Sequence, residues 1–170
     1  MCSPQKNGKY FDTHVNNILK ETYEPIVLDE IEIAKKYGAQ FRAIDTMIIT
    51  YNGYMVFLQY KLHKSSISPR DIIYFYSQCE TLSKEEKKPY ICIYVSYEGI
   101  TDNSVKWIEE HKKNNLYLYD FISINNKNEN ILIQEIVKYL YSKEIFLYEN
   151  DKTAIMQNTE HEFFRYCIKV

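Results

Sequence analysis

The sequence predicts a single α/β domain built on a mixed β-sheet with helices on both faces. The chain has 170 residues, of which 45% are hydrophobic and 26% charged, so one domain with a substantial core is expected. An Asn-Gly turn between two β-rich runs predicts an antiparallel hairpin in the first half. Strand and helix patterns alternate in the second half, which predicts parallel crossovers. The domain should span residues 1–170, with a core from about residue 8 to about residue 143 and a C-terminal extension over 144–170.

The N-terminal part shows a helix pattern followed by an apolar stretch. A helix is expected from about Lys9 to Thr22, after a frayed terminus of about seven residues. Apolar residues at helical spacing line one of its faces: Phe11, Val15, Ile18 and Leu19. The stretch from Pro25 to Lys35 is rich in Ile, Val and Leu, and predicts a strand despite its acidic residues.

The hairpin is the clearest local pattern in the chain. Its arms are predicted over Arg42–Thr50 and Tyr54–Leu62. Asn52 and Gly53 lie between them, and both tolerate the positive φ angles that a two-residue type I′ turn demands. We therefore expect a two-residue type I′ turn at Asn52 and Gly53.

A capped helix and a buried strand follow the hairpin. Ser68, Pro69 and Asp71 supply an N-cap, a first-turn proline and a first-turn acid, so a helix begins there. Its apolar face is predicted to comprise Ile72, Phe75, Tyr76 and Cys79, with a solvated end or loop over Ser83–Lys88. The apolar run Tyr90–Val95 predicts a central strand that is buried on both faces.

The last third of the chain predicts two more helices and one or two strands. Thr101 or Asp102 caps a helix, and Leu116–Phe121 is the next strand. The first of these helices should bury Val105, Trp107 and Ile108, and the second Leu132, Ile136, Val137 and Leu140. A further strand is predicted over Ile145–Tyr148.

Composition limits the classes of function. The net charge of −2 provides no global basic field, so any contact with nucleic acid must come from a local patch. No signal segment or membrane span is recognisable. The four cysteines are far apart in the sequence, which indicates free thiols and an intracellular, reducing compartment, the cytoplasm or the nucleus.

Polar residues at the ends of the hairpin arms suggest a metal site. Asp45 begins the first arm, and Gln59 and Lys61 end the second. A hairpin brings these residues to one end of a sheet, with Gln59 and Lys61 on one face and Tyr60 on the other. Two oxygen ligands suit Mg²⁺, and an amine beside them would complete the parts needed to cut a phosphodiester.

These residues and their order resemble the PD-(D/E)xK nuclease superfamily, and within it the Mrr-like branch of restriction endonucleases. Gly8-Lys9-Tyr10-Phe11-Asp12 is similar to the Gly-x-x-Phe-Glu opening of that branch. Asp45 matches the aspartate of the family motif, and Gln59-Tyr60-Lys61 its Gln-x-Lys variant. The segment Pro89–Phe121 resembles the following strand, Thr-capped helix and strand, so the likeness covers Gly8–Phe121.

The resemblance implies a restriction-endonuclease-like fold of the αβββαβ type and a metal-dependent endonuclease that hydrolyses DNA. Asp45, Gln59 and Asp12 would hold Mg²⁺ or Mn²⁺, with the Tyr60 backbone carbonyl beside them, and Lys61 would assist the attacking water. The family more often has glutamate at the positions of Gln59 and Asp12, so this site carries less negative charge and a shorter acid. DNA is the implied partner, and a homodimer is an analogy only.

Polar residues after the motif are candidates for phosphate contacts, which position a duplex without reading its sequence. They are His63, Lys64, Ser66 and Arg70. A plain polar loop explains these residues equally well. Tyr76 and Gln78 could face the same cleft, although packing is the simpler expectation.

Two other functions remain open on the same fold. One is a non-catalytic subunit that binds nucleic acid or joins an assembly, in which Asp45 caps a strand, Gln59 is an edge amide and Lys61 is a solvated strand end. The other is a resolvase of branched DNA such as the Holliday junction, since the same hairpin motif serves such enzymes.

Overall fold

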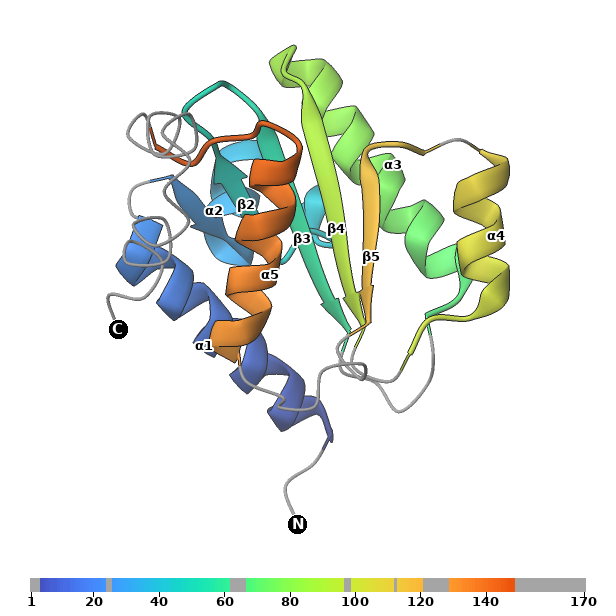
Figure 1. The fold of residues 1–170 in the computed structure, drawn as a ribbon. Helices are drawn as coiled ribbons and strands as arrows, with labels where there is room; N and C mark the ends of the chain where they lie inside the picture. Colours follow the sequence, from blue (N-terminus) through green and yellow to red (C-terminus); the bar gives the residue numbers. More distant parts are fainter. Residues whose placement is uncertain are drawn as a thin grey trace.

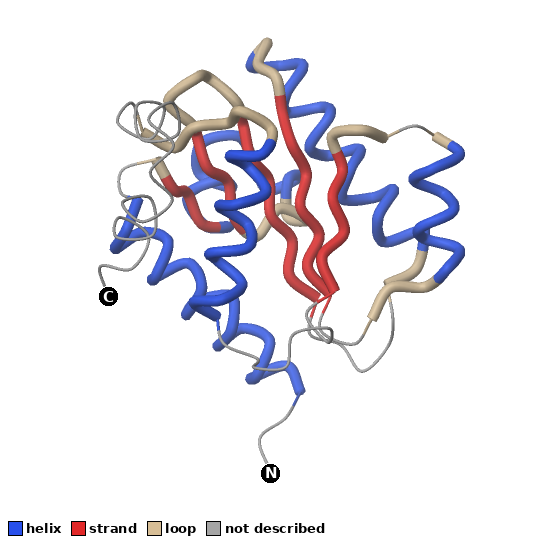
Figure 2. Tube along the Cα trace, in the orientation of Figure 1, coloured by secondary structure: helices blue, strands red, loops and turns tan. Residues whose placement is uncertain are grey.

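The computed structural model describes residues 4–23, 26–61, 67–96, 99–111, 113–120 and 129–148. Helices and strands alternate along them (Figures 1 and 2). The helices are α1 (Pro4–Tyr23), α2 (Glu30–Tyr37), α3 (Pro69–Glu86), α4 (Asp102–Glu110) and α5 (Glu129–Ser142), with a short 3₁₀ turn over Ala39–Phe41. The strands are β1 (Val27–Asp29), β2 (Thr46–Ile49), β3 (Met55–Lys61), β4 (Tyr90–Ser96) and β5 (Leu116–Asp120).

The predicted mixed α/β sheet is confirmed. The five strands lie in the order β1-β2-β3-β4-β5. The pairs β1/β2 and β2/β3 are antiparallel, whereas β3/β4 and β4/β5 are parallel. In these registers Thr46 lies opposite Leu58, and Gln59 lies beside Tyr94.

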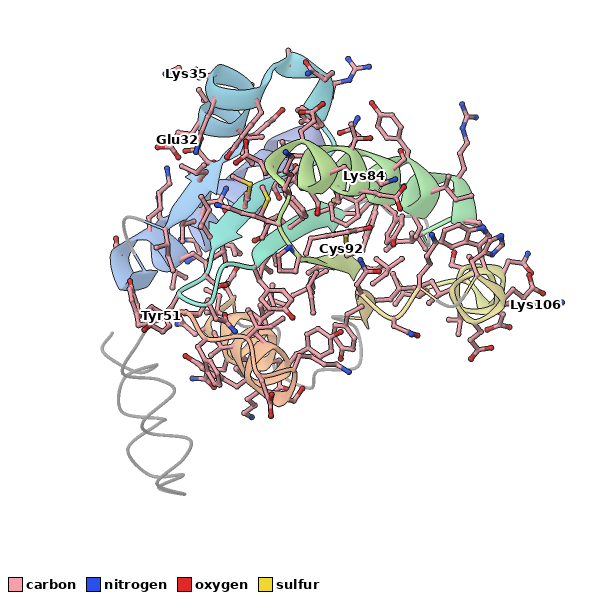
Figure 3. The ribbon with its side chains drawn as sticks, turned by 90° about the horizontal axis from the view of Figure 1, so that it is seen from above. Glu32, Lys35, Tyr51, Lys84, Cys92 and Lys106 are labelled. Carbon is pink, nitrogen blue, oxygen red and sulfur yellow. The ribbon has the colours of Figure 1, made fainter. Side chains whose placement is uncertain are left out.

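Helices cover both faces of the sheet, and each face has its own hydrophobic core. One core joins α1 and α5 to the sheet, through buried residues such as Leu19, Leu58 and Leu140. The other joins α3 to the opposite face, through residues such as Phe57 and Phe75. Seen from above, α3 and α5 lie on opposite sides of the strands, with Cys92 of β4 between them (Figure 3). No helix among the described residues is long and apolar enough to cross a membrane.

The first corrections to the sequence-based predictions concern the N-terminal part. Helix α1 already begins at Pro4, before the expected start at Lys9. The predicted strand over Pro25–Lys35 is only three residues long, because Asp29 ends it and caps α2. The Asp29 carboxylate accepts from the Glu32 amide at 3.0 Å, and the Glu32 carboxylate accepts from the Asp29 amide at 2.9 Å. The spacing Asp-x-x-Glu is a capping-box signature, and it marks a helix start within the stretch that was predicted as a strand.

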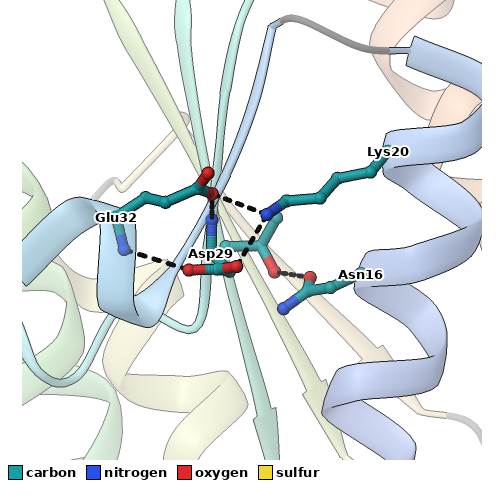
Figure 4. A network of polar contacts seen from close by, with 5 residues as sticks. Asn16, Lys20, Asp29 and Glu32 are labelled. Carbon is teal, nitrogen blue, oxygen red and sulfur yellow. Dashed lines mark hydrogen bonds and ion pairs between the residues drawn. The ribbon is translucent and has the colours of Figure 1, made fainter.

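Lys20 of α1 ties the same capping box to the first helix. Its Nζ lies 2.6 Å from both Asp29 Oδ2 and Glu32 Oε2 (Figure 4). Burial acts to raise the pKa of Asp29, but the Lys20 hydrogen bond and the Glu32 amide outweigh it and lower that pKa overall. The network therefore fixes α2 against α1 at the edge of the sheet.

The hairpin turn also differs from the prediction. The Thr50 amide donates to the Tyr54 carbonyl at 3.0 Å, so three residues, Tyr51 to Gly53, form the loop instead of two. Gly53 has a φ of +85°, while no positive φ is found at Asn52. The Asn52 side chain is used elsewhere, because its amide donates to the Glu144 carbonyl at 2.7 Å and its oxygen accepts from the Phe146 amide at 3.1 Å. A type I turn followed by a left-handed glycine is the usual form of such a three-residue loop.

The second half follows the prediction closely, with two exceptions. Ser68 begins α3, β4 is buried from Ile91 to Ser96, and Thr101 caps α4. Val105, however, is 43% exposed, so α4 does not bury it as expected. The residues 145–148 form no strand. They contact the hairpin turn instead, where the Tyr51 amide donates to the Phe146 carbonyl at 2.9 Å.

A buried polar cluster between α1 and the sheet offers a first test of the fold. Thr46 is fully buried; its hydroxyl donates to the Asn16 side-chain oxygen and lies 3.3 Å from the Tyr60 hydroxyl. Replacing Asn16 with alanine should lower the free energy of unfolding by about 1–3 kcal/mol, because Thr46 loses a buried partner. Urea denaturation measures this change, with the exposed neighbour Asn17→Ala as control. Equal stability of the two variants would contradict this account of α1 docking.

Candidate functional site

Asp45 lies where β2 meets the C-terminal end of β3. Its amide donates to the Leu58 carbonyl at 3.0 Å, and its Oδ2 accepts from the Tyr60 amide at 2.7 Å. The Tyr60 amide lies beyond Thr46 and Leu58, the last paired residues of β2 and β3, so the carboxylate replaces a backbone partner there. Asp45 therefore does cap a strand end, and the same bond holds its carboxylate against the peptide that joins Gln59 to Tyr60.

Asp12, on α1, supplies a second carboxylate, whose charge acts on Asp45. Burial raises the pKa of Asp12 to about 7, and the negative charge of Glu30 adds to this shift. Burial likewise raises the pKa of Asp45 well above its usual range, with Asp12 and Glu30 adding repulsion while the Tyr60 amide opposes the shift. The charge of Asp12 thus raises the pKa of Asp45, and the charge of Glu30 raises the pKa of both residues. A group of acids that repel one another marks a place where a cation would be favourable.

Gln59 supplies an amide oxygen on the opposite face of β3 from Tyr60. The Tyr60 ring is buried in the α1 side of the core, as the alternation along the strand predicts. The Gln59 side chain lines a cavity on the α3 side. Its Oε1 is buried without a hydrogen-bond partner, and the same holds for Oδ1 of Asp12. A buried acceptor without a partner is costly and calls for an explanation such as an ion or a water.

The candidate ligand atoms are oxygens, the kind of ligand that Mg²⁺ prefers. Among the described residues no three His, Cys, Asp or Glu side chains are grouped as a metal site. Such a group is not required here, because the predicted set is two carboxylates and one amide, and Mg²⁺ keeps several of its waters. Asp12 and Gln59 each offer an orphaned buried oxygen. Asp45 is bonded to the Tyr60 amide, next to Gln59, and the charge of Asp12 acts on it. The Tyr60 carbonyl as a further ligand stays a prediction.

Lys61 has a partner that the sequence did not suggest. Its Nζ forms an ion pair of 2.6 Å with Asp71 Oδ2, at the first turn of α3. Asp71 also accepts from the Ser68 amide at 3.1 Å and the Ser68 hydroxyl at 2.7 Å. Burial acts to raise the pKa of Asp71, but Lys61 and Ser68 outweigh it and lower that pKa. The alternative interpretation of Lys61 as a solvated strand end is thus wrong, because its amine is paired at the first turn of α3. Its predicted catalytic role stays a prediction.

A cavity of about 520 Å³ opens beside these residues, between the end of β3 and the start of α3. Gln59, Tyr60 and Lys61 contribute to it from β3. The rest of its lining comes from Arg42, Ala43, Arg70, Asp71, Tyr74, Phe75 and Tyr94. Arg70 is exposed, which is consistent with the predicted role in contacting phosphates.

Sequence reasoning missed Tyr94 as a member of this site. Its ring is 4% exposed on the buried strand β4, beside Gln59 in the parallel register. Burial raises the pKa of Tyr94, and the charges of Asp71 and Asp45 contribute, so its hydroxyl lies in the field of both carboxylates. Only the strand order reveals this position, since the sequence shows Tyr94 simply as part of an apolar run.

The remaining predicted contacts divide into two groups. His63, Lys64 and Ser66, with their neighbour Ser65, lie outside the described residues. Tyr76 and Gln78 make contacts within the fold, in line with the simpler expectation that they serve packing. The Tyr76 hydroxyl donates to Asn115 at 2.9 Å, and the Gln78 oxygen accepts from the Ala43 amide at 2.9 Å.

Comparison with known proteins adds no relative to this picture. No protein-family model, curated protein or solved structure matches the chain. The case for function therefore depends on the residues and geometry of the chain itself.

Proposed function

We propose that the protein is a metal-dependent endonuclease that hydrolyses DNA phosphodiester bonds. The observation that carries the proposal is the pair of orphaned buried oxygens, Asp12 Oδ1 and Gln59 Oε1. The charge of Asp12 acts on Asp45, and Asp45 accepts from the Tyr60 amide, next to Gln59 in the chain. Gln59 belongs to the Gln-x-Lys motif, and Asp12 to the helix opening that resembles that of the Mrr-like branch. Both residues were expected to bind the metal, so their buried atoms without partners support the proposal.

The order of elements supports a restriction-endonuclease-like core. Helix α1, strands β1 to β3, helix α3 and strand β4 follow the expected αβββαβ order, with α2 added between β1 and β2. The three N-terminal strands form the antiparallel part, and β4 joins β3 in parallel. Gln59 and Lys61 lie at the C-terminal end of β3, which faces the start of α3.

In this proposal each side chain has a separate task. Asp45, Gln59 and Asp12 hold Mg²⁺ or Mn²⁺, which when bound would polarise the phosphate and lower the pKa of the attacking water. Asp45 is oriented by the Tyr60 amide, so its second oxygen is free to turn toward the ion. Lys61 places a positive charge beside the phosphate, and Asp71 orients the Lys61 amine from the first turn of α3.

A plasmid-nicking assay tests the proposal directly. Supercoiled DNA is incubated with wild-type protein in Mg²⁺, Mn²⁺ or EDTA, beside Lys61→Met and the control Lys84→Met on the exposed end of α3. We expect metal-dependent nicking by the wild type and the control. Lys61→Met should be about 10²- to 10³-fold slower, because it loses the charge that stabilises the transition state.

The result also separates the alternatives. If no metal supports cleavage of any DNA form, the non-catalytic binding subunit takes precedence, and the Lys61–Asp71 ion pair would then be a structural contact. Cleavage that is confined to four-way junctions would instead identify a resolvase. Equal rates for Lys61→Met and wild type would refute the assigned role of Lys61.

A further inference from the structure

The cavity between β3 and α3 has the size and lining of a ligand site. Its volume of about 520 Å³ lies within the range typical of small-molecule pockets. Rigid elements build it, since β3 and β4 form its base and the first turns of α3 form one wall. Of its residues only Gln59, Tyr60 and Lys61 belong to the motif, so most of the lining has no role in the proposed cleavage.

The charge of the cavity selects an anion. Three cationic side chains line it, Arg42, Lys61 and Arg70, against the single carboxylate of Asp71, which leaves a local charge of +2. The whole chain has a net charge of −2, so this is a local reversal of sign. Arg42 and Arg70 are both exposed at its rim, where guanidinium groups can bind phosphate oxygens in the bidentate manner.

The aromatic lining selects a flat ring. Tyr94 of the base and Phe75 of the α3 wall have ring centroids 5.4 Å apart in an edge-to-face arrangement. Tyr74, on the exposed side of α3, is 48% exposed, and its hydroxyl is close enough to the Arg42 guanidinium to raise the pKa of Arg42, so an aromatic face and a guanidinium lie together at the rim. Bases that are not paired stack on such faces, and a nearby cation strengthens the contact.

We propose that this cavity binds an unpaired nucleotide of the DNA strand, with its base stacked on Tyr74 and its phosphate held by Arg42 and Arg70. Gln59 lines both the cavity and the proposed metal site, so this nucleotide lies next to the phosphodiester that is cut. Bases within an intact duplex are stacked on each other and cannot reach Tyr74. The preferred substrate class is therefore single-stranded or branched DNA. That this DNA is a substrate, and not only a ligand, rests on the proposed nuclease function.

Binding without cleavage tests the inference. Fluorescence anisotropy in EDTA compares a labelled oligothymidylate with a blunt duplex of the same length, so that no hydrolysis can occur. We expect the single strand to bind more tightly than the duplex. Tyr74→Ala should weaken single-strand binding about 5- to 100-fold and change duplex binding less than about twofold, because only the unpaired base uses the ring.

Matched variants make the test specific. Tyr74→Phe keeps the stacking face and should retain most of the affinity, whereas Tyr51→Ala, at an equally exposed tyrosine on the hairpin turn, should bind like wild type. Arg42→Gln should weaken the binding and reduce its dependence on salt. Thermal melting confirms that each variant is folded.

Three results would overturn the inference: equal affinity for single strand and duplex, no effect of Tyr74→Ala, or full competition by thymidine monophosphate at oligonucleotide concentrations, which would indicate a site for free nucleotides. The nicking assay fails or succeeds independently. A chain that binds single strands through Tyr74 but never cuts would retain this site and lose the proposed function.

Discussion

Replacing Asp45 with asparagine is expected to abolish metal-dependent cleavage and, at the same time, to stabilise the metal-free protein. Asparagine keeps an oxygen that can accept from the Tyr60 amide, so the backbone contact at 2.7 Å survives. It removes the charge that would bind the cation, and a loss of at least about 10³-fold in cleavage rate is expected, equivalent to about 4 kcal/mol. The metal-free protein gains because burial and the repulsion from Asp12 both disfavour the Asp45 carboxylate.

Differential scanning fluorimetry and the nicking assay measure the two effects on one sample. Wild type should gain about 2.7 kcal/mol when Mn²⁺ is present at 100 times its dissociation constant, while Asp45→Asn should gain nothing. Asp102→Asn, at the exposed start of α4, is the matched control and should behave like wild type in both assays. A variant that melts lower than wild type without metal would show that Asp45 is mainly a structural cap, in favour of the non-catalytic alternative.

The second large effect is a dependence of stability on pH that runs opposite to ordinary acid denaturation. Burial, with help from Glu30, raises the pKa of Asp12 from 3.8 in its ordinary state to about 7 in the folded protein. The folded protein therefore holds a proton on Asp12 more tightly than the unfolded chain does. This stabilising contribution is complete below about pH 4 and is lost as the pH rises to about 7, where up to about 4 kcal/mol has disappeared.

Urea denaturation from pH 4 to pH 8 measures this trend as a difference between wild type and Asp12→Asn. Taking the difference cancels carboxylates such as Asp29 and Asp71, whose lowered pKa values favour folding as the pH rises. We expect Asp12→Asn to be more stable than wild type at pH 8 and the difference to shrink toward pH 4.

Metal binding should depend on the same ionisation of Asp12, but the metal affinity should rise with pH where the stability falls. Asp12 must lose its proton before it can bind a cation, so metal affinity should rise about tenfold per pH unit until pH 7 and then level off. Calorimetric titration with Mn²⁺ at several pH values tests this. A pH-independent affinity in wild type, or a stability difference that does not change between pH 4 and pH 8, would remove Asp12 from the proposed site.

Short-range patterns in the sequence determined much of this protein. The Asn-Gly hairpin, the Ser68 start of α3, the buried strand β4 and the Thr101 cap all rest on neighbouring residues, whose conformational preferences act without help from the rest of the chain. The same locality explains why Asp45 and Gln59 could be expected at one end of a sheet. The errors were local as well, since the Asp29 capping box and the three-residue loop at Gly53 are alternatives to the predicted strand and turn that equally short segments encode.

Only the tertiary structure decided how the site is completed. The Lys61–Asp71 ion pair joins a strand to a helix, and Tyr94 reaches Gln59 through a parallel pairing across a crossover. Neither contact has a sequence spacing that predicts it, because parallel strands can pair in many orders and registers with the same hydrophobic pattern. The unpaired oxygens of Asp12 and Gln59 are likewise invisible in the sequence. Whether a polar atom lacks a partner depends on every group packed around it, and packing is set by the whole fold.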